Sequence, residues 1–167
     1  NEHLGSARGV YDPVHPNDHV NMAQSTNDVI PTAIRLAALA TLVPALAACD
    51  TLVATLRAQA VRFDPLVKAG RTHLQDAMPI RLGQEFAGWA GAVERGTARV
   101  RATADHLLDL GIGGTAVGTG VNAEPVYAAR MVAELARRAG PRVRQGDPVV
   151  LMQSMGDLVA VSGACRA

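Results

Sequence analysis

The sequence predicts an all-α protein, a long-helix bundle with an irregular N-terminal segment. Two long stretches carry apolar residues at spacings that alternate between three and four, the pattern with which one helix packs along another. Alanine and leucine dominate these stretches, and aromatic residues make up only 3% of the chain. We find no convincing strand pattern, so no strands are expected.

Residues 1–30 are polar and contain Pro13 and Pro16, which predicts irregular structure. The first long helix is expected to begin with Asp28 as its N-cap, because Asp accepts hydrogen bonds from the free N–H groups of a first turn. It is expected to end near Asp64. The apolar seam of this helix is Leu39, Leu42, Leu46, Cys49, Val53, Leu56 and Ala60.

A second seam follows Pro79 and predicts another helix, about 40 Å long at ~1.5 Å per residue. Its positions are Leu82, Phe86, Trp89, Val93, Gly96, Val100, Thr103, Leu107 and Leu110. Five glycines within residues 111–120 end this pattern and need a specific backbone path. A shorter helix is expected after Pro125, and a last one is expected to start at residues 146–148.

We expect residues 1–27 to end an N-terminal domain and residues 28–167 to form part of a central helical-bundle domain. The last apolar segment reaches Ala167 without a stop signal, so we expect the chain to be a piece of a longer protein. The two long helices of one chain cannot bury all of their apolar surface against each other. The bundle is therefore expected to be shared between subunits.

The composition argues against several kinds of partner. The 167 residues include 16 Lys and Arg against 15 Asp and Glu, so charge predicts no binding to nucleic acid or to an anionic membrane. No uninterrupted apolar run reaches membrane-spanning length. Cys49 and Cys165 lie far apart in the sequence and indicate reduced thiols in a cytoplasmic protein.

The chemistry of the chain is concentrated in two polar clusters, each of which is expected at the start of a long helix. The first polar cluster, residues 24–28, brings together two amides, two hydroxyls and a carboxylate. The second polar cluster, residues 70–77, brings together a cation, a hydroxyl, an imidazole, an amide and a carboxylate. Each oxygen of a small dicarboxylate needs a donor once water is excluded, so the two clusters predict a pocket for such a ligand.

Each cluster also has an ordinary structural interpretation. Ser, Thr, Asn and Asp are the favoured N-caps, although four in a row exceed what one cap uses, and the surplus suits an anion. His73 could be an ordinary loop histidine, but its polar neighbours suit holding a carboxylate or moving a proton. His15, Asp18 and His19 lack further ligands at metal spacing, which favours a turn or a secondary anion site.

Three stretches together resemble the aspartase/class II fumarase superfamily. They are residues 15–28, from His-Pro-Asn-Asp to Gln-Ser-Thr-Asn-Asp; residues 70–76, Gly-Arg-Thr-His-Leu-Gln-Asp; and residues 113–120, Gly-Gly-Thr-Ala-Val-Gly-Thr-Gly. They cover nearly the whole chain in order, and motifs of this length are highly specific. The resemblance implies part of the family's central helical bundle, and a homotetramer whose active sites are shared between subunits.

The resemblance also assigns roles to particular residues. It implies that five side chains bind a small dicarboxylate substrate: Ser25, Thr26, Asn27, Thr72 and His73. It matches three residues to a secondary, non-catalytic anion site: His15, Asn17 and Asp18. The family's catalytic loop, which carries the serine base, matches nothing in this chain, so no catalytic residue is expected here. Neither a metal nor a cofactor is implied.

We expect the longer protein to be a lyase and this chain alone to be inactive. Thr26 within Gln-Ser-Thr-Asn-Asp resembles aspartases, whereas fumarases more often have a second Ser at that position. The sequence therefore favours aspartate ammonia-lyase, which eliminates ammonia from L-aspartate to give fumarate. Fumarate hydratase, which interconverts malate and fumarate, is the alternative, and a non-catalytic helical scaffold is a second alternative.

Overall fold

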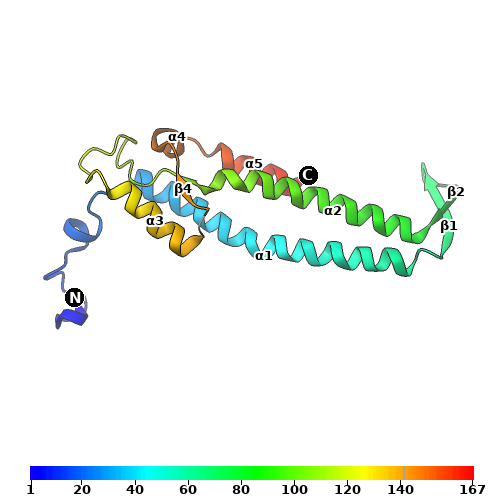
Figure 1. Cartoon of the computed structure of the whole chain (residues 1–167), viewed down its shortest axis with the longest axis horizontal. Helices are drawn as coiled ribbons and strands as arrows, with labels where there is room; N and C mark the ends of the chain where they lie inside the picture. Colours follow the sequence, from blue (N-terminus) through cyan, green and yellow to red (C-terminus); the bar gives the residue numbers. More distant parts are fainter. Residues whose placement is uncertain (141) are drawn as a thin grey trace. The chain divides into compact units, whose positions relative to one another are not determined.

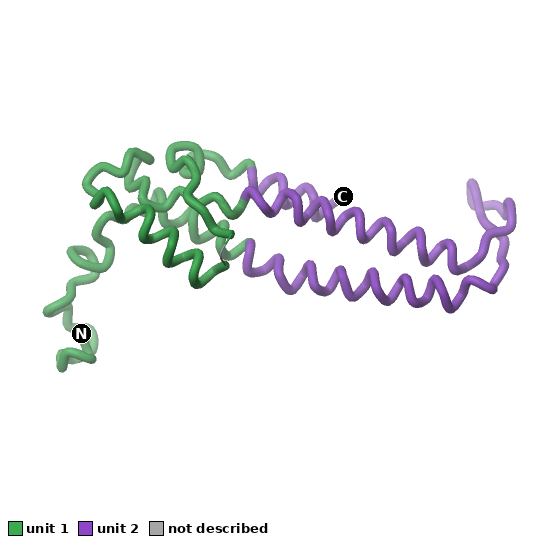
Figure 2. The backbone as a smooth tube through the Cα atoms, in the orientation of Figure 1, with its two compact units in different colours: residues 1–38, 107–156 green, residues 39–106, 157–167 purple. Residues whose placement is uncertain are grey.

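The computed structural model describes residues 1–140 and 142–167. They form two compact units (Figure 2): unit 1 contains residues 1–38 and 107–156, and unit 2 contains residues 39–106 and 157–167. Helices make up 61% of the structure, which confirms the predicted fold class. The expected domain division after residue 27 concerns a longer protein and stays a prediction.

The longest element is α1 (Thr26–Arg62), a helix of 37 residues (Figure 1). It begins with a reciprocal cap, in which the Ser25 hydroxyl accepts from the Asn27 N–H at 3.2 Å and the Asp28 carboxylate accepts from the Ser25 N–H at 3.0 Å. Ser25 is therefore the N-cap. The prediction that Asp28 caps the helix is wrong, because several consecutive residues here are competent to cap. The predicted end of the helix near Asp64 is confirmed.

In unit 2, the later turns of α1 lie beside α2 (Leu82–Ala104). The ion pairs Arg57–Glu94 and Arg101–Asp50 connect the two helices. All seven predicted seam positions of α1 are half-buried, while most residues between them are exposed. The heptad prediction is therefore confirmed for α1.

The seam of α2 differs from the prediction at alternate positions. Its buried residues include small ones that each follow a predicted seam position: Gly83, Ala90, Thr97 and Ala104. Trp89, by contrast, is 51% exposed. A Cβ on Gly83 would lie 2.3 Å from the Ala60 carbonyl oxygen, so the two backbones approach closely there. A pattern of apolar residues assigns the larger residue of an adjacent pair, such as Trp89, to the buried seam. The close approach of the two backbones instead requires the smaller residue, such as Ala90, at that place. The helix also ends earlier than predicted, at a 3₁₀ turn, η3 (Asp105–Leu108).

An antiparallel hairpin of β1 (Val67–Thr72) and β2 (Gln75–Arg81) joins the two helices of unit 2. The expectation of no strands is therefore wrong. The chain lacks the Asn-Gly or Asp-Gly pair that most strongly marks a two-residue hairpin turn. A bulge surrounds Gly70, where a Cβ would lie 2.8 Å from the Met78 carbonyl oxygen. The polar cluster of residues 70–77 thus forms the end of a hairpin, not the start of a helix.

Unit 1 combines the first turns of α1 with short elements. These are η1 (Glu2–Leu4), the π-helical turn η2 (Pro16–Val20), the helices α3 (Tyr127–Ala139) and α4 (Pro148–Gln153), and the parallel two-residue strands β3 (Asp109–Leu110) and β4 (Arg144–Gln145). The helix predicted after Pro125 is α3. The buried apolar side chains include Leu107, Leu108, Leu110, Ile112, Val132 and Val143. Polar residues are buried as well: Asp28, Thr32, Arg35 and Thr115.

The single C-terminal helix predicted from the sequence is two helices, α4 and α5 (Gly156–Arg166). Asp147 caps α4, and extended backbone at Ser154, with φ −111° and ψ 134°, ends it. The fully buried Arg35 guanidinium donates to the carbonyl oxygens of Leu151 at 3.0 Å and Ser154 at 2.9 Å. A cation is favourable at a helix C-terminus. The break thus coincides with contacts from a distant residue, which local patterns do not reveal.

By length and composition, α1 is one helix in the described part of the chain that could cross a membrane. This test averages hydropathy along the helix, whereas the sequence prediction concerns an uninterrupted apolar run, and polar residues such as Thr41 and Asp50 interrupt this one. A core helix of a water-soluble bundle passes the same test, because its Ala and Leu residues face other helices. The buried contacts of Arg35 and the ion pairs of Asp50 and Arg57 indicate a helix packed against protein.

Candidate functional site

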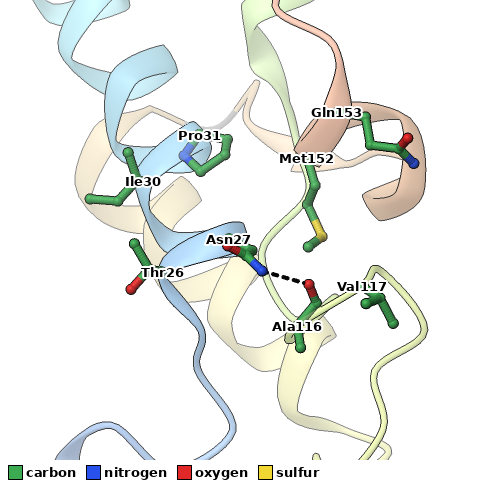
Figure 3. Close-up of a pocket in the computed structure, with 8 residues that line it drawn as sticks. All are labelled: Thr26, Asn27, Ile30, Pro31, Ala116, Val117, Met152 and Gln153. Carbon is green, nitrogen blue, oxygen red and sulfur yellow. Dashed lines mark hydrogen bonds between the residues drawn. The ribbon is translucent and has the colours of Figure 1, made fainter.

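A pocket of about 460 Å³ opens in unit 1, between the start of α1, the glycine-rich segment (residues 111–120) and α4 (Figure 3). Volumes of this order are typical of small-molecule sites. The lining consists of Thr26, Asn27, Ile30, Pro31, Ala116, Val117, Met152 and Gln153. Thr26 and Asn27, two members of the first polar cluster, therefore face this cavity, and their role in binding a ligand stays a prediction.

Asp28 connects two walls of this pocket. It is fully buried, and one of its carboxylate oxygens accepts from the N–H groups of Gly113 and Thr115, both at 3.0 Å. The other oxygen accepts from the Ser25 N–H. Hydrogen bonds from backbone N–H groups to a carboxylate are stronger than those between neutral groups. The start of α1 and the glycine-rich segment are therefore held together by one side chain.

The glycine-rich segment reaches this carboxylate by a left-handed path. Gly113 has a φ of 91°, and a Cβ there would lie 2.4 Å from the Ala128 Cβ. Thr115 has a φ of 56°, a conformation that is unfavourable for a β-branched residue. Its N–H is bound by Asp28, and strain of this kind persists only where the surroundings enforce it. The prediction of a specific backbone path is confirmed.

The first cluster keeps hydrogen-bond donors for a ligand. In Figure 3 the Asn27 amide nitrogen donates to the Ala116 carbonyl at 2.8 Å, and the Met152 side chain points toward this bond from α4. Among the described residues, no acceptor is seen for the second N–H of Asn27 or for the hydroxyl protons of Ser25 and Thr26. These groups lie at a helix N-terminus, where the backbone N–H groups and the helix dipole favour an anion.

Thr72 and His73 belong to unit 2, at the exposed end of the β1–β2 hairpin. Thr72 pairs with Gln75 across a turn in which His73 and Leu74 both have a left-handed φ, 48° and 62°. This is the geometry of a type I′ turn, which usually uses Asn and Gly. Leu74 is 99% exposed. The turn therefore places the His73 imidazole and the Thr72 hydroxyl next to the solvent-exposed side chain of Leu74.

The residues of the predicted secondary anion site lie together at η2. The Nδ1 atom of His15 accepts from the N–H groups of Asn17 at 3.2 Å and Asp18 at 3.3 Å, and the Nδ1 atom of His19 accepts from the His15 N–H at 2.9 Å. Each neutral ring therefore carries its proton on Nε2. The Asp18 carboxylate is 3.3 Å from Nδ1 of His15, but that nitrogen cannot be protonated while it accepts. Within the described ranges, no group of three or more His, Cys, Asp or Glu residues is placed to hold a metal ion.

A second cavity of unit 1, about 590 Å³, is lined by residues that include His19, Gln24 and Tyr127. The Tyr127 hydroxyl is buried and finds no hydrogen-bond partner among the described residues. Burial, and to a smaller extent the charge of Asp28, raises the pKa of Tyr127 above 10.0. The hydroxyl is therefore neutral near pH 7 and can act as a donor.

A family model described as a lyase matches the chain over residues 1–167. The chain belongs to this family, the aspartase/class II fumarase superfamily of lyases. Class II fumarate hydratases of Methylorubrum extorquens and Neisseria meningitidis are 51% and 46% identical over 100% and 99% of the chain. The aspartate ammonia-lyase of Pseudomonas canavaninivorans is 44% identical over 99% of the chain. The chain spans about a third of these relatives, covering 36%, 36% and 35% of their lengths.

Solved structures agree with this assignment. A fumarate lyase:delta crystallin from Brucella melitensis, bound to cobalt, matches 98% of the chain with a TM-score of 0.92 and 43% identity, and the chain covers 36% of it. A class II fumarase from Schistosoma mansoni matches 91% of the chain with a TM-score of 0.85 and 29% identity, and the chain covers 35% of it. The resemblance inferred from the three motifs is confirmed.

Sequence reasoning missed two parts of this site. Asp28 is predicted as a simple cap, yet its carboxylate also binds residues 85 and 87 positions further along the chain. Met152 and Gln153 line the pocket without any motif that marks them. The surplus of capping residues at the start of α1 is the one sequence signal that could have indicated a second role for Asp28.

Proposed function

We propose that the full-length protein is a class II fumarate hydratase, which interconverts fumarate and malate. The observation that carries this proposal is the 51% identity to the Methylorubrum extorquens enzyme over 100% of the chain. The aspartate ammonia-lyases of Bacillus subtilis and Pseudomonas canavaninivorans are 45% and 44% identical. The preference for an aspartase that Thr26 suggests is therefore reversed, because one residue in a shared motif carries less weight than identity across the chain.

In this proposal the first polar cluster binds a carboxylate of the substrate. The hydroxyls of Ser25 and Thr26 and the free N–H of Asn27 act as donors, and the helix terminus adds favourable electrostatics. The hydrogen bond from Asn27 to the Ala116 carbonyl supports this role, since it restricts the amide to one orientation.

The second cluster is proposed to hold the carboxylate next to the carbon that loses its proton. Negative charge develops on that carboxylate, and donors placed in advance lower the barrier. Thr72 and His73 supply a hydroxyl and an imidazole for this purpose. The base that removes the proton is expected outside residues 1–167, so this chain alone is proposed to be inactive.

The family resemblance supports a homotetramer in which segments of other subunits complete each site. The exposed apolar residues of the hairpin, Val67, Leu74 and Met78, suit burial in such an assembly. We also propose a cytoplasmic location, with neither a membrane nor nucleic acid as partner. The family resemblance and the near-even balance of 16 Lys and Arg against 15 Asp and Glu support this.

Aspartate ammonia-lyase remains the second candidate, because Thr26 and the aspartase relatives favour it. A non-catalytic scaffold has less support, since a scaffold would have no use for the polar groups gathered at the pocket.

The test is to incubate the full-length protein with fumarate, with and without ammonium, and to identify the products. We expect fumarate to be consumed without ammonium and to give malate. Consumption that requires ammonium and gives aspartate would refute the proposal in favour of the aspartase, and no consumption in either mixture would favour the scaffold. Residues 1–167 expressed alone serve as the inactive control.

A further inference from the structure

We propose that Asp28 is a positioning residue, which orients the Asn27 amide toward substrate by fixing the glycine-rich segment to the start of α1. The inference rests on the proposed substrate-binding role of Asn27. The Asp28 carboxylate binds the N–H groups of Gly113 and Thr115, and the next residue, Ala116, accepts from the Asn27 side chain. Because Asn27 and Asp28 are adjacent, these bonds close a ring between the helix and the loop.

The ring depends on the chemistry of a carboxylate. Both oxygens of Asp28 accept, and together they receive three backbone N–H groups at 3.0 Å. An Asn at this position would turn its NH₂ group toward at least one of those backbone N–H groups. That N–H group would then have no acceptor. The resulting loss would be large because Asp28 is fully buried and water cannot replace the missing bond.

The loop that Asp28 holds does not prefer its observed conformation. Thr115 is left-handed although it is β-branched, and its N–H is one of those bound. Release of the carboxylate would let Thr115 return to ordinary backbone angles, which would move the neighbouring Ala116 carbonyl. The Asn27 amide would then lose the acceptor that orients it, and an N–H aimed at substrate would become mobile.

A double-mutant cycle in the full-length protein tests this proposal, using Asp28→Asn, Asn27→Ala and the double variant. We expect D28N to raise the KM for fumarate about tenfold or more. In the N27A background the same change should alter KM by less than about twofold, because Asp28 acts through Asn27. Hydrogen exchange of residues 111–120 should become faster in D28N. Asp50→Asn makes the same chemical change at an exposed carboxylate of α1, paired with Arg101, and should leave KM and exchange unchanged.

An equal rise in KM for D28N with and without Asn27 would overturn the proposal, as would unchanged loop exchange in a folded D28N enzyme. If D28N does not fold, Asp28→Glu, which keeps the charge one methylene further out, replaces it in the cycle and should raise KM by a smaller factor. The exchange measurement does not depend on the substrate. Failure of the proposed hydratase activity can therefore be distinguished from failure of the positioning role. If the protein proves to be an aspartate ammonia-lyase, the same cycle is measured with aspartate as substrate.

Discussion

Replacement of Arg35 by methionine probes the polar core of unit 1. The Arg35 side chain is fully buried, and its guanidinium donates to the carbonyl oxygens of Pro31 at 3.3 Å, Leu151 at 3.0 Å and Ser154 at 2.9 Å. Methionine has a similar length but no donor. The Leu151 and Ser154 carbonyls would lose this partner, at about 1–3 kcal/mol each when water cannot reach them.

The expected net loss of stability lies near the lower end of the range that the two carbonyls give together. Ser154 is exposed, so water can solvate its carbonyl after the substitution. Removing the guanidinium also relieves the cost of keeping a charge out of water. We therefore expect R35M to lower the free energy of unfolding by about 2–3 kcal/mol, a large part of the ~5–15 kcal/mol typical of a domain.

The assay is urea unfolding of the full-length protein, followed by circular dichroism. Protein concentrations are matched because the proposed association of subunits would make the measured stability depend on concentration. Arg101→Met is the matched control. Its side chain is 49% exposed and pairs with Asp50, so the loss should be below about 1 kcal/mol. A loss for R35M no larger than that for R101M would show that the buried contacts do not stabilise this unit.

Two further substitutions test individual polar groups of unit 1. Tyr127→Phe removes a buried hydroxyl that has no partner among the described residues, so it should raise the free energy of unfolding by up to about 1 kcal/mol; a clear loss would mean that this hydroxyl has a partner in the full-length protein. Hydrogen bonds from Arg137 and Arg138 lower the pKa of Glu134 to about 2. A lowered pKa contributes stability above the unfolded value of ~4.3, and this contribution is lost as the pH falls toward 2. The small difference in urea midpoint between wild type and Glu134→Gln should therefore be present at neutral pH and shrink below about pH 4; a difference that grows with acidity would contradict this assignment.

Much of the helical framework could be predicted because it follows from local patterns. The seam of α1 repeats over seven positions, and each is half-buried. Asp147 precedes a proline at the start of a helix, and it caps α4 as its residue type and position predict. The first polar cluster was expected beside a pocket, and Thr26 and Asn27 line one.

Other features depend on residues far apart in the chain. The row of small residues on α2 is buried because backbone atoms of α1 come within van der Waals reach of Gly83. No short window of sequence contains both Gly83 and Ala60, so periodicity alone predicted the α2 seam incorrectly. The β1–β2 hairpin is local, but it turns at His73 and Leu74 without the residues that usually mark such a turn, so local propensity missed it.

The sequence by itself determined the family and the helical class, because motifs and heptads are local. Only the tertiary structure decided what Asp28 and Arg35 do. Both are charged residues near the start of a helix, where a solvated face is the ordinary expectation. Both are instead fully buried, since two hydrogen-bonding partners of each lie 85 to 119 positions away and meet it only when the chain folds.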